Sequence, residues 1–341
     1  MTSVDDRQAI LSVRNLEVTF GTQEGEVKAV QGVSFDVFQG ETIGIVGESG
    51  SGKSVTANSI IRLNFGADVR ISGEILLDGR DILKMNEDEI RKVRGKDVAM
   101  IFQDPLTALN PFYTVGDQIG EAYAVHHPDA TKKELRAIAL DSLEKVGIPE
   151  PRKRIDQYPH EFSGGMRQRI VIAIALVNRP KLLIADEPTT ALDVTVQAQI
   201  LELISEMQQE NGSAVMLITH DLGVVAEITR RVMVMYAGRV VETASVDDVF
   251  GVPTHPYTLG LLRSVKSLES SRHSRLEAIS GTPPSLINLP SGCAFHPRCT
   301  FAGSLGGRCL LEVPSLRSVG SSRSACHLDD VRLRGLKGSD R

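Results

Sequence analysis

The amino-acid sequence predicts an α/β protein built on a parallel sheet, with a helical insertion and a small, irregular C-terminal region. Strand and helix patterns alternate along the first 265 of the 341 residues, as in folds with a parallel sheet. Helical patterns dominate residues 105–175, and the apolar periodicity weakens after residue 265. We therefore expect a large domain over 1–265 that contains the insertion, and a second domain over 266–341.

The expected strands are short segments of apolar or alternating residues bounded by turn formers. They lie at residues 10–38 (strands around a Gly-containing turn), 42–47 (TIGIVG), 71–83 (a hairpin around Asp78-Gly79), 98–102, 182–186 (LLIAD), 214–220 (AVMLITH) and 232–242 (a second hairpin). The continuous apolar runs at 182–186 and 214–220 are typical of a buried parallel sheet.

Helical spacing marks the segments between these strands. Residues 54–63 follow a Gly-rich turn, and residues 131–148 in the insertion are amphipathic. The latter begin with a capping box formed by Thr131 and Glu134. Residues 197–212 (QAQILELISEMQQENG) predict a crossover helix that ends at a glycine.

Composition indicates a globular chain. Apolar residues make up 41% and charged residues 24%, which argues against disorder, collagen or a coiled coil over the whole chain. The longest aliphatic run, residues 170–177, is far shorter than the roughly 20 residues of a membrane span. The first ten residues do not resemble a signal peptide. We expect a cytosolic chain that reaches a membrane only by docking on an embedded partner.

Charge is distributed unevenly along the chain. Residues 266–341 contain 11 Lys or Arg and 6 Asp or Glu, a net charge of +5. The whole chain has a net charge of −5, so residues 1–265 carry −10. A negative main body does not fit a general nucleic-acid binder, although it does not exclude a local basic groove.

The four cysteines, Cys293, Cys299, Cys309 and Cys326, all lie in the last fifth of the chain. A reducing compartment argues against structural disulfides. Four thiolates can bind zinc or an iron–sulfur cluster, but the spacing lacks the C-x₂₋₄-C pairs typical of zinc sites. The residues leave three alternatives: an iron–sulfur cluster, zinc with His296 or His327 as substitute ligands, and free or redox-active thiols.

A phosphate-binding loop follows the strand at 42–47. Residues 47–54 read GESGSGKS and fit the pattern G-x-x-x-x-G-K-[ST] between a strand and a helix. The backbone N–H groups and the helix N-terminus can hold phosphate oxygens, Lys53 can reach the β- and γ-phosphates, and the Ser54 hydroxyl can bind Mg²⁺. The residues expected to bind ATP here are Gly47, Ser49, Gly50, Ser51, Gly52, Lys53, Ser54 and Val55.

Two carboxylates lie at the end of the strand at 182–186. Asp186 is expected to bind Mg²⁺, usually through water, and Glu187 to orient and polarise the attacking water. Acidic residues are common caps at strand ends, so the pair alone would be modest evidence for a catalytic role. Its position downstream of a phosphate-binding loop makes that evidence strong. Together these segments predict nucleotide hydrolysis.

Residues 162–169 (FSGGMRQR) narrow the choice among phosphate-loop proteins. Ser163, Gly164 and Gly165 open a helix, where a hydroxyl and backbone amides form a second anion-binding surface. The segment resembles the signature motif of ABC ATPases, LSGGQ, with Phe162 and Met166 at the positions where Leu and Gln are commonest.

The resemblance to ABC ATPases covers at least residues 10–265 and implies a core with an antiparallel β subdomain and a helical subdomain. It also implies roles for four further residues. Gln103 in FQDP matches the Q-loop, which senses the γ-phosphate and Mg²⁺ and faces the membrane subunit. Asp193 in ALD (191–193) matches the D-loop of the dimer interface, and His220 in ITHD matches the switch histidine that contacts the γ-phosphate. Phe20 takes the place of the aromatic residue that stacks on adenine, where Tyr is commoner.

The resemblance also implies a dimer that holds ATP between its subunits. Each site combines the phosphate loop of one subunit with the signature of the other. The residues at 163–165 therefore serve the ATP bound mainly by the other subunit. ATP closes the dimer and hydrolysis reopens it, which is a ligand-driven population shift.

Finer motifs resemble the ATPase subunits of bacterial dipeptide and oligopeptide permeases. They are residues 102–111 (FQDPLTALNP), 158–169 (YPHEFSGGMRQR), 220–225 (HDLGVV) and 255–262 (HPYTLGLL). Only 110 residues separate Lys53 from Ser163, too few for the insertions of DNA-repair and chromosome proteins of the superfamily. The chain has one cassette, unlike translation factors of this type, and none of the membrane helices of an exporter.

This resemblance implies an importer with two membrane permease subunits, a solute-binding protein and usually a second, different ATPase. The chain would then lie on the cytoplasmic face of the membrane. The resemblance implies dipeptides or oligopeptides as the cargo. Nickel, sugars and other solutes remain alternatives, because the cassette does not contact the solute. The rival hypothesis is a soluble ATPase that remodels or regulates a partner without transport.

The cysteine-containing tail also resembles the C-terminal domain of this subfamily. Residues 292–299 (GCAFHPRC), Cys309 and residues 325–328 (ACHL) carry this likeness. In this family such cysteines look like ligands of a [4Fe–4S] cluster. We expect the cluster to stabilise a tail that has too few apolar residues for a core of its own.

Overall fold

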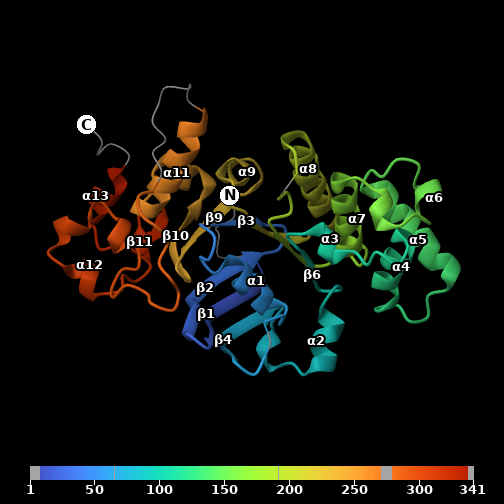
Figure 1. Ribbon diagram of the computed structural model, residues 1–341, viewed down its shortest axis with the longest axis horizontal. Helices are drawn as coiled ribbons and strands as arrows, with labels where there is room; N and C mark the ends of the chain where they lie inside the picture. Colours follow the sequence, from blue (N-terminus) through green and yellow to red (C-terminus); the bar gives the residue numbers. More distant parts are fainter. Residues whose placement is uncertain (1–7, 65, 191, 270–278, 337–341) are drawn as a thin grey trace. The chain divides into compact units, whose positions relative to one another are not determined.

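The computed structural model describes residues 8–64, 66–190, 192–269 and 279–336. The chain divides into two compact units, each assembled from separate segments. Unit 1 contains Met1–Leu11, Val37–Glu41 and Leu77–Ile218, and unit 2 contains Ser12–Asp36, Thr42–Leu76 and Thr219–Arg341. The helices and strands are labelled in Figure 1.

Three parallel strands form the centre of unit 1. Strand β7 (Leu182–Asp186) pairs with β6 (Val98–Ile101) on one side and with β8 (Ala214–Ile218) on the other. Every residue of β7 and β8 is buried, so their continuous apolar sequences match strands covered on both faces. The predicted buried parallel strands are confirmed.

The chain between β6 and β7 is helical. It contains α3 (Pro105–Ala108), α4 (Val115–Ala124), α5 (Lys132–Lys145), α6 (Pro151–Arg154), the 3₁₀ turn η3 (Pro159–Glu161) and α7 (Gly164–Leu176). Helices α4, α5 and α7 pack on one another (Figure 1, green). The predicted capping box is present, because the Thr131 hydroxyl accepts the Glu134 N–H and the Glu134 carboxylate accepts the Thr131 N–H.

Two further predictions in unit 1 are confirmed, and one boundary differs. Helix α8 (Val194–Asn211) ends at Gly212, which has the left-handed backbone expected of a glycine stop. Asp78 and Gly79 both have positive φ, as in a type I′ turn. Strand β5 (Arg80–Asp81) ends before residue 83, because the Asp81 carboxylate accepts the Leu83 N–H and begins the 3₁₀ turn η2 (Ile82–Lys84). Helix α2 (Glu87–Val93) follows.

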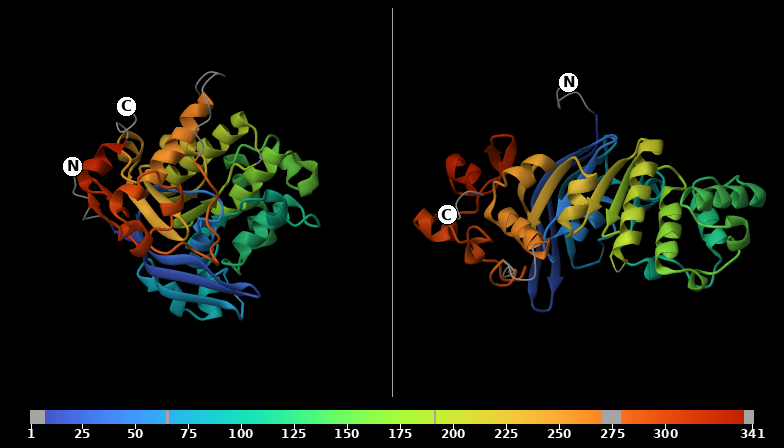
Figure 2. Two further views of the ribbon diagram at one scale, coloured as in Figure 1. Left: turned by 60° about the vertical axis from the view of Figure 1, so that its left-hand side comes forward. Right: turned by 90° about the horizontal axis from the view of Figure 1, so that it is seen from above.

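Most of unit 2 is built on five strands in the order β11-β12-β10-β9-β3. Strand β3 (Thr42–Val46) pairs in parallel with β9 (Arg231–Tyr236), and β9 forms the predicted hairpin with β10 (Arg239–Ser245). The tail adds β12 (Ser322–Ser324) and β11 (Arg317–Val319) along the free edge of β10. Figure 2 shows these orange and red segments side by side.

Unit 2 also contains further strands and helices. They are β1 (Ala9–Thr22), β2 (Gly25–Phe38) and β4 (Val69–Leu77) of a second sheet, and the helices α1 (Lys53–Ile60), α9 (Leu222–Ile228), α10 (Val246–Gly251), α11 (Pro256–Glu269), α12 (Arg308–Leu311) and α13 (Asp330–Arg334), with the 3₁₀ turns η4 (His296–Arg298) and η5 (Ala302–Leu305). The first strand, β1, begins in unit 1. Helix α11 runs through residue 265. The domain boundary predicted at that residue remains a prediction.

The C-terminal tail buries apolar side chains by sharing them with the rest of unit 2. Its own Val319, Leu328, Leu333 and Leu336 form one buried cluster with Leu259 of α11. The tail therefore has a core, but one that depends on α11. Among the described residues, no helix combines the length and apolar character needed to cross a bilayer.

A buried polar network connects the residues just before α11 to strands β10 and β12. The Glu242 carboxylate accepts both the N–H and the hydroxyl of Thr254, and the Ser324 hydroxyl donates to the Thr254 carbonyl at 2.7 Å. The His255 Nδ1 atom accepts the Tyr257 N–H at 3.1 Å. The acceptor nitrogen of His255 gives a physical role to the histidine at the start of residues 255–262.

We predict that His255 makes the fold sensitive to acid. Burial lowers the pKa of His255 to about 4, whereas an unfolded histidine titrates near 6.5. Between these values only the unfolded chain binds the proton, so the free energy of unfolding should fall as pH drops from 6.5 to 4, by about 3 kcal/mol in total. Urea unfolding across this pH range measures the slope.

The variant His255→Asn keeps an acceptor for the Tyr257 N–H but does not titrate, so it should lose this part of the slope. The difference between native and variant isolates His255 from Glu242, whose pKa burial raises and whose effect on stability has the opposite sign. His160→Asn, at an exposed position, serves as the control. An unchanged slope in His255→Asn would contradict the prediction.

Candidate functional site

The phosphate-binding loop joins β3 to α1 in unit 2, as the sequence predicts. Two of its glycines, Gly47 and Gly52, are required because neighbouring backbone comes very close. A Cβ atom on Gly47 would lie 2.2 Å from the Met235 carbonyl oxygen, and one on Gly52 would lie 2.5 Å from the Ala29 carbonyl oxygen. Both residues have positive φ, so any side chain would also be strained there.

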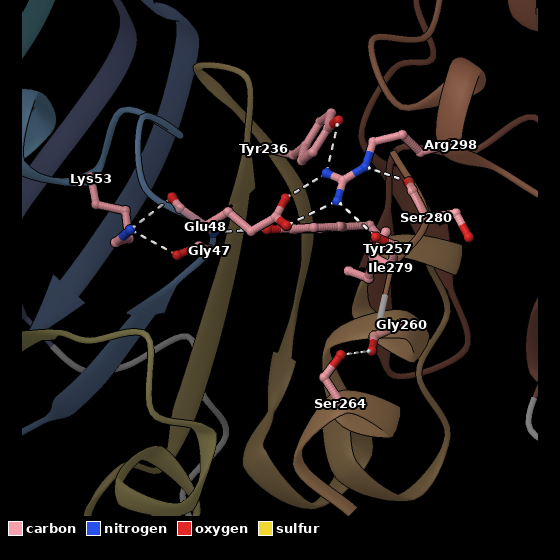
Figure 3. Close-up of polar contacts among 10 residues, drawn as sticks. All are labelled: Gly47, Glu48, Lys53, Tyr236, Tyr257, Gly260, Ser264, Ile279, Ser280 and Arg298. Atoms are coloured by element: carbon pink, nitrogen blue, oxygen red, sulfur yellow. Dashed lines mark hydrogen bonds and ion pairs between the residues drawn. The ribbon is translucent and has the colours of Figure 1, made fainter. Parts of the chain in front are cut away.

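Lys53 closes this loop on itself. Its Nζ atom donates to the carbonyl oxygens of Gly47 at 2.7 Å and Glu48 at 3.0 Å (Figure 3). The side chain is buried, and the buried Ser51 hydroxyl has no hydrogen-bond partner among the described residues. Ser54 is exposed at the first turn of α1. A buried ammonium, an unpaired hydroxyl and a glycine backbone together fit an anionic ligand such as a polyphosphate.

Two other predicted residues of unit 2 lie on separate elements. Phe20 is partly exposed on β1. His220 is exposed between β8 and α9, directly before Asp221. The Asp221 carboxylate caps α9 by accepting the N–H groups of Gly223 and Val224, which fixes the end of the loop that carries His220.

Unit 1 brings Gln103 and Glu187 together. The Gln103 side-chain amide donates to Glu187 Oε2 at 3.0 Å, and the Thr190 hydroxyl donates to the same oxygen at 2.9 Å. Asp186, the last residue of β7, is buried, and Glu187 follows with a positive φ of 48°. Such backbone strain at a strand end is typical of functional sites.

The signature segment begins α7. Ser163 is the N-cap residue, and its Oγ atom accepts the Met166 N–H at 3.4 Å. Gly165 packs so close to α8 that a Cβ atom there would lie 2.6 Å from Val196. Asp193 caps α8 by accepting the Val196 N–H, while Ala191 of the predicted ALD motif lies outside the described residues.

Sequence reasoning missed two contacts in unit 1. Gln168 is buried on α7 and donates to the Pro188 carbonyl at 2.6 Å, which joins the signature helix to the loop after Glu187. Thr190 also holds the Glu187 carboxylate. In the sequence, only their closeness to a recognised motif could have marked Gln168 and Thr190. Side-chain amides and hydroxyls are too common in loops to indicate a functional contact by themselves.

The four cysteines are free thiols that line one small pocket in unit 2. Burial raises the pKa of all four, to about 11 for Cys299 and about 12 for Cys326. Neighbouring backbone N–H groups lower these pKa values and so offset part of the rise: those of residues 295 and 296 at Cys293, those of 301 and 302 at Cys299, and that of 328 at Cys326.

The predicted metal ligands are not arranged as a ligand set. Across residues 8–64, 66–190, 192–269 and 279–336, no group of three or more His, Cys, Asp or Glu side chains has a geometry that could hold a metal ion. His296 and His327, the substitute zinc ligands, contact backbone carbonyls. His296 Nδ1 lies 2.9 Å from the Cys293 oxygen, and His327 Nε2 lies 2.8 Å from the Glu312 oxygen.

Comparison with known proteins identifies two family regions in the chain. The ABC transporter family model matches residues 30–190. The model of the oligopeptide/dipeptide transporter C-terminal region matches residues 241–305. The second match includes two of the four cysteines, Cys293 and Cys299.

Relatives match over most of the chain. A putative peptide import ATP-binding protein of Brucella melitensis is 52% identical over 324 residues, which are 92% of this chain and 95% of the relative. The oligopeptide transport ATP-binding protein OppD of Bacillus subtilis is 54% identical over 294 residues, 86% of this chain and 82% of the relative.

A solved structure confirms the predicted fold. The dimeric post-hydrolysis state of the ATP-binding cassette MJ0796 bound to ADP and Pi has a TM-score of 0.62 and 28% identity. It covers 69% of this chain and 98% of that one. Together with relatives above 50% identity over most of the chain, this shows that the protein belongs to the ABC transporter family, as an ATPase subunit with the oligopeptide/dipeptide transporter C-terminal region.

Proposed function

We propose that this chain is the ATP-binding and ATP-hydrolysing subunit of a bacterial ABC importer for dipeptides or oligopeptides. The observation that carries the proposal is that relatives named for peptide import and oligopeptide transport match over 86% or more of the chain. The match to the oligopeptide/dipeptide transporter C-terminal region supports the same assignment.

ATP binding begins at the phosphate loop. Lys53 exchanges the carbonyl oxygens of Gly47 and Glu48 for the β- and γ-phosphates, and the loop N–H groups with Ser51 receive the remaining oxygens. Ser54, Gln103 and Asp186 would hold Mg²⁺, and the ion would neutralise charge on the phosphates. Phe20 provides the aromatic surface for adenine.

Glu187 is the residue proposed to activate water. Gln103 and Thr190 both donate to its Oε2 atom, which holds the carboxylate in one orientation for the role of general base. His220 contacts the γ-phosphate in this mechanism. The proposed roles of these residues follow the resemblance to ABC ATPases together with this hydrogen bonding.

Ser163, Gly164 and Gly165 act on the ATP bound by the other subunit of a dimer. The dimeric cassette bound to ADP and Pi supports dimerisation as the general mode of this fold. We propose that the second subunit is a different ATPase, that Asp193 lies at the interface between them, and that the pair docks on two permease subunits at the cytoplasmic face of the membrane. A solute-binding protein delivers the peptide from outside.

We predict that Glu187→Gln abolishes hydrolysis without abolishing ATP binding. Loss of the general base should lower the rate at least about 100-fold in the assembled transporter, and ATP should then trap the closed dimer. Glu202→Gln on the exposed face of α8 is the matched control and should hydrolyse ATP normally. Unchanged turnover in Glu187→Gln would reject the mechanism.

The cargo is tested on the complex purified with its permeases and solute-binding protein. Dipeptides and oligopeptides should stimulate ATP hydrolysis, and nickel should not. Stimulation by nickel or another solute would assign the chain to that class of importer. Failure to recover any permease with the chain would favour the soluble, non-transport ATPase.

A second proposal concerns the four cysteines, which we assign to a [4Fe–4S] cluster in preference to zinc or free thiols. Four cysteine thiols, the donors that hold such a cluster, line one pocket. They do not stand in metal-binding geometry in this structure, so cluster binding would have to draw them together. Burial raises the pKa of these thiols, so iron binding would have to release their protons.

We predict that protein purified without oxygen contains about four iron atoms per chain and is brown. Cys299→Ser should lower the iron content, whereas Ser304→Ala, an exposed hydroxyl in the same segment, should not. Iron and zinc are measured by elemental analysis, independently of ATPase activity. One zinc per chain without iron would instead assign zinc, and absence of both metals would leave free thiols.

A further inference from the structure

Glu48, the second residue of the phosphate loop, is held at three points. Its carbonyl oxygen accepts from Lys53 Nζ, its N–H donates to the Tyr257 hydroxyl at 2.8 Å, and its carboxylate meets Arg298 (Figure 3). Lys53 belongs to the loop itself. Tyr257 and Arg298 belong to α11 and the tail, so two of the three contacts come from residues 241–305, which match the oligopeptide/dipeptide transporter C-terminal region.

The contact between Arg298 and Glu48 is bidentate and largely buried. Arg298 Nη1 lies 2.6 Å from Glu48 Oε2, and Nη2 lies 3.0 Å from Oε1. Only 5% of the Arg298 side chain and 27% of the Glu48 side chain are exposed. Such paired bonds fix the orientation of both groups more strictly than a single contact does.

The surroundings of Arg298 satisfy the rest of its guanidinium. Nε donates to the Ser280 carbonyl, Nη2 also donates to the Ile279 carbonyl, and Nη1 also donates to the Tyr236 hydroxyl. With the two bonds to Glu48, each of the five N–H donors of arginine has an acceptor. Arg298 is therefore held firmly within unit 2. An exposed surface ion pair, in contrast, contributes little to stability.

The arrangement directs the Glu48 carboxylate away from Lys53. Figure 3 shows the carbonyl of Glu48 facing Lys53 and its side chain extending in the opposite direction toward Arg298. A carboxylate released from Arg298 would be free to approach the bound phosphates and repel them. The released loop would also spend less time in the conformation that binds ATP, which lowers apparent affinity in proportion.

We propose that Arg298 is a positioning residue for ATP binding: it holds Glu48 so that the phosphate loop stays open to phosphates, and the C-terminal region thereby sets the affinity of the subunit for ATP. The inference rests on the proposed ATPase function. Arg298 lies directly before Cys299, so the segment that lines the cysteine pocket is also the segment that controls the loop.

The test measures the dissociation constant of Mg·ATP for the full-length chain by calorimetry. Arg298→Ala should weaken binding about tenfold, the result of lowering the competent loop population to about one tenth. Arg298→Lys retains a charge but not the bidentate geometry, and should fall between native and Arg298→Ala. In the assembled transporter KM for ATP should rise while kcat changes less than about twofold.

A double variant separates positioning from a purely structural role. Glu48→Gln in the Arg298→Ala background removes the released negative charge, so the double variant should bind ATP more tightly than Arg298→Ala alone. If Arg298 only stabilised the fold, the second substitution would bring no recovery. Should Arg298→Ala be insoluble, the same comparison is made between Arg298→Lys and Arg298→Lys with Glu48→Gln.

Arg308→Ala is the matched control. Arg308 also precedes a cysteine, but its partner is the exposed Glu312. Binding within twofold of native in Arg298→Ala, equal weakening in Arg308→Ala, or no recovery in the double variant would each overturn the inference. Failure of the native chain to bind ATP would instead contradict the proposed function, so the two failures are distinguishable.

Discussion

The close approach of backbone around the phosphate loop is the constraint on which the nucleotide site depends. At Gly47 and Gly52 the neighbouring carbonyl oxygens, those of Met235 and Ala29, occupy the space of a side chain. Only glycine therefore fits at these two positions, where β9 and β2 pass beside the loop. Folding of unit 2 places the loop amides before any ligand arrives, so binding does not have to order them.

In unit 1, the orientation of one carboxylate, that of Glu187, is fixed by two hydrogen-bond donors. Glu187 has strained backbone and follows directly from a fully buried strand. Gln103 precedes the helical insertion in sequence, whereas Thr190 follows Glu187 by three residues. The long insertion between β6 and β7 separates these residues in sequence without separating them in space.

The C-terminal tail is integrated into unit 2 by strands and by shared core residues. Strand β12 extends β10, and Leu259 of α11 completes the apolar cluster of the tail. A tail that pairs with β10 and contacts Glu48 through Arg298 is placed to influence the phosphate loop directly. The expectation of a tail without an apolar core is therefore corrected in part, because packing against α11 gives the tail a buried apolar cluster.

The sequence by itself determined the local features whose causes are local. The buried strands at 182–186 and 214–220, the capping box at Thr131 and the phosphate loop all follow from short-range pattern and spacing. Such features depend on periodicity and on hydrogen bonds between residues a few positions apart. The resemblance based on these motifs was sufficient to identify the family.

Only the tertiary structure decided which distant residues meet. Arg298 and Glu48 are 250 positions apart, and nothing in either segment marks the other as a partner. The pairing of β12 with β10, and the two donors on Glu187, are likewise invisible in sequence. The physical reason is that an arginine, a glutamine or a short strand has many equivalent partners in sequence, and chain packing selects one.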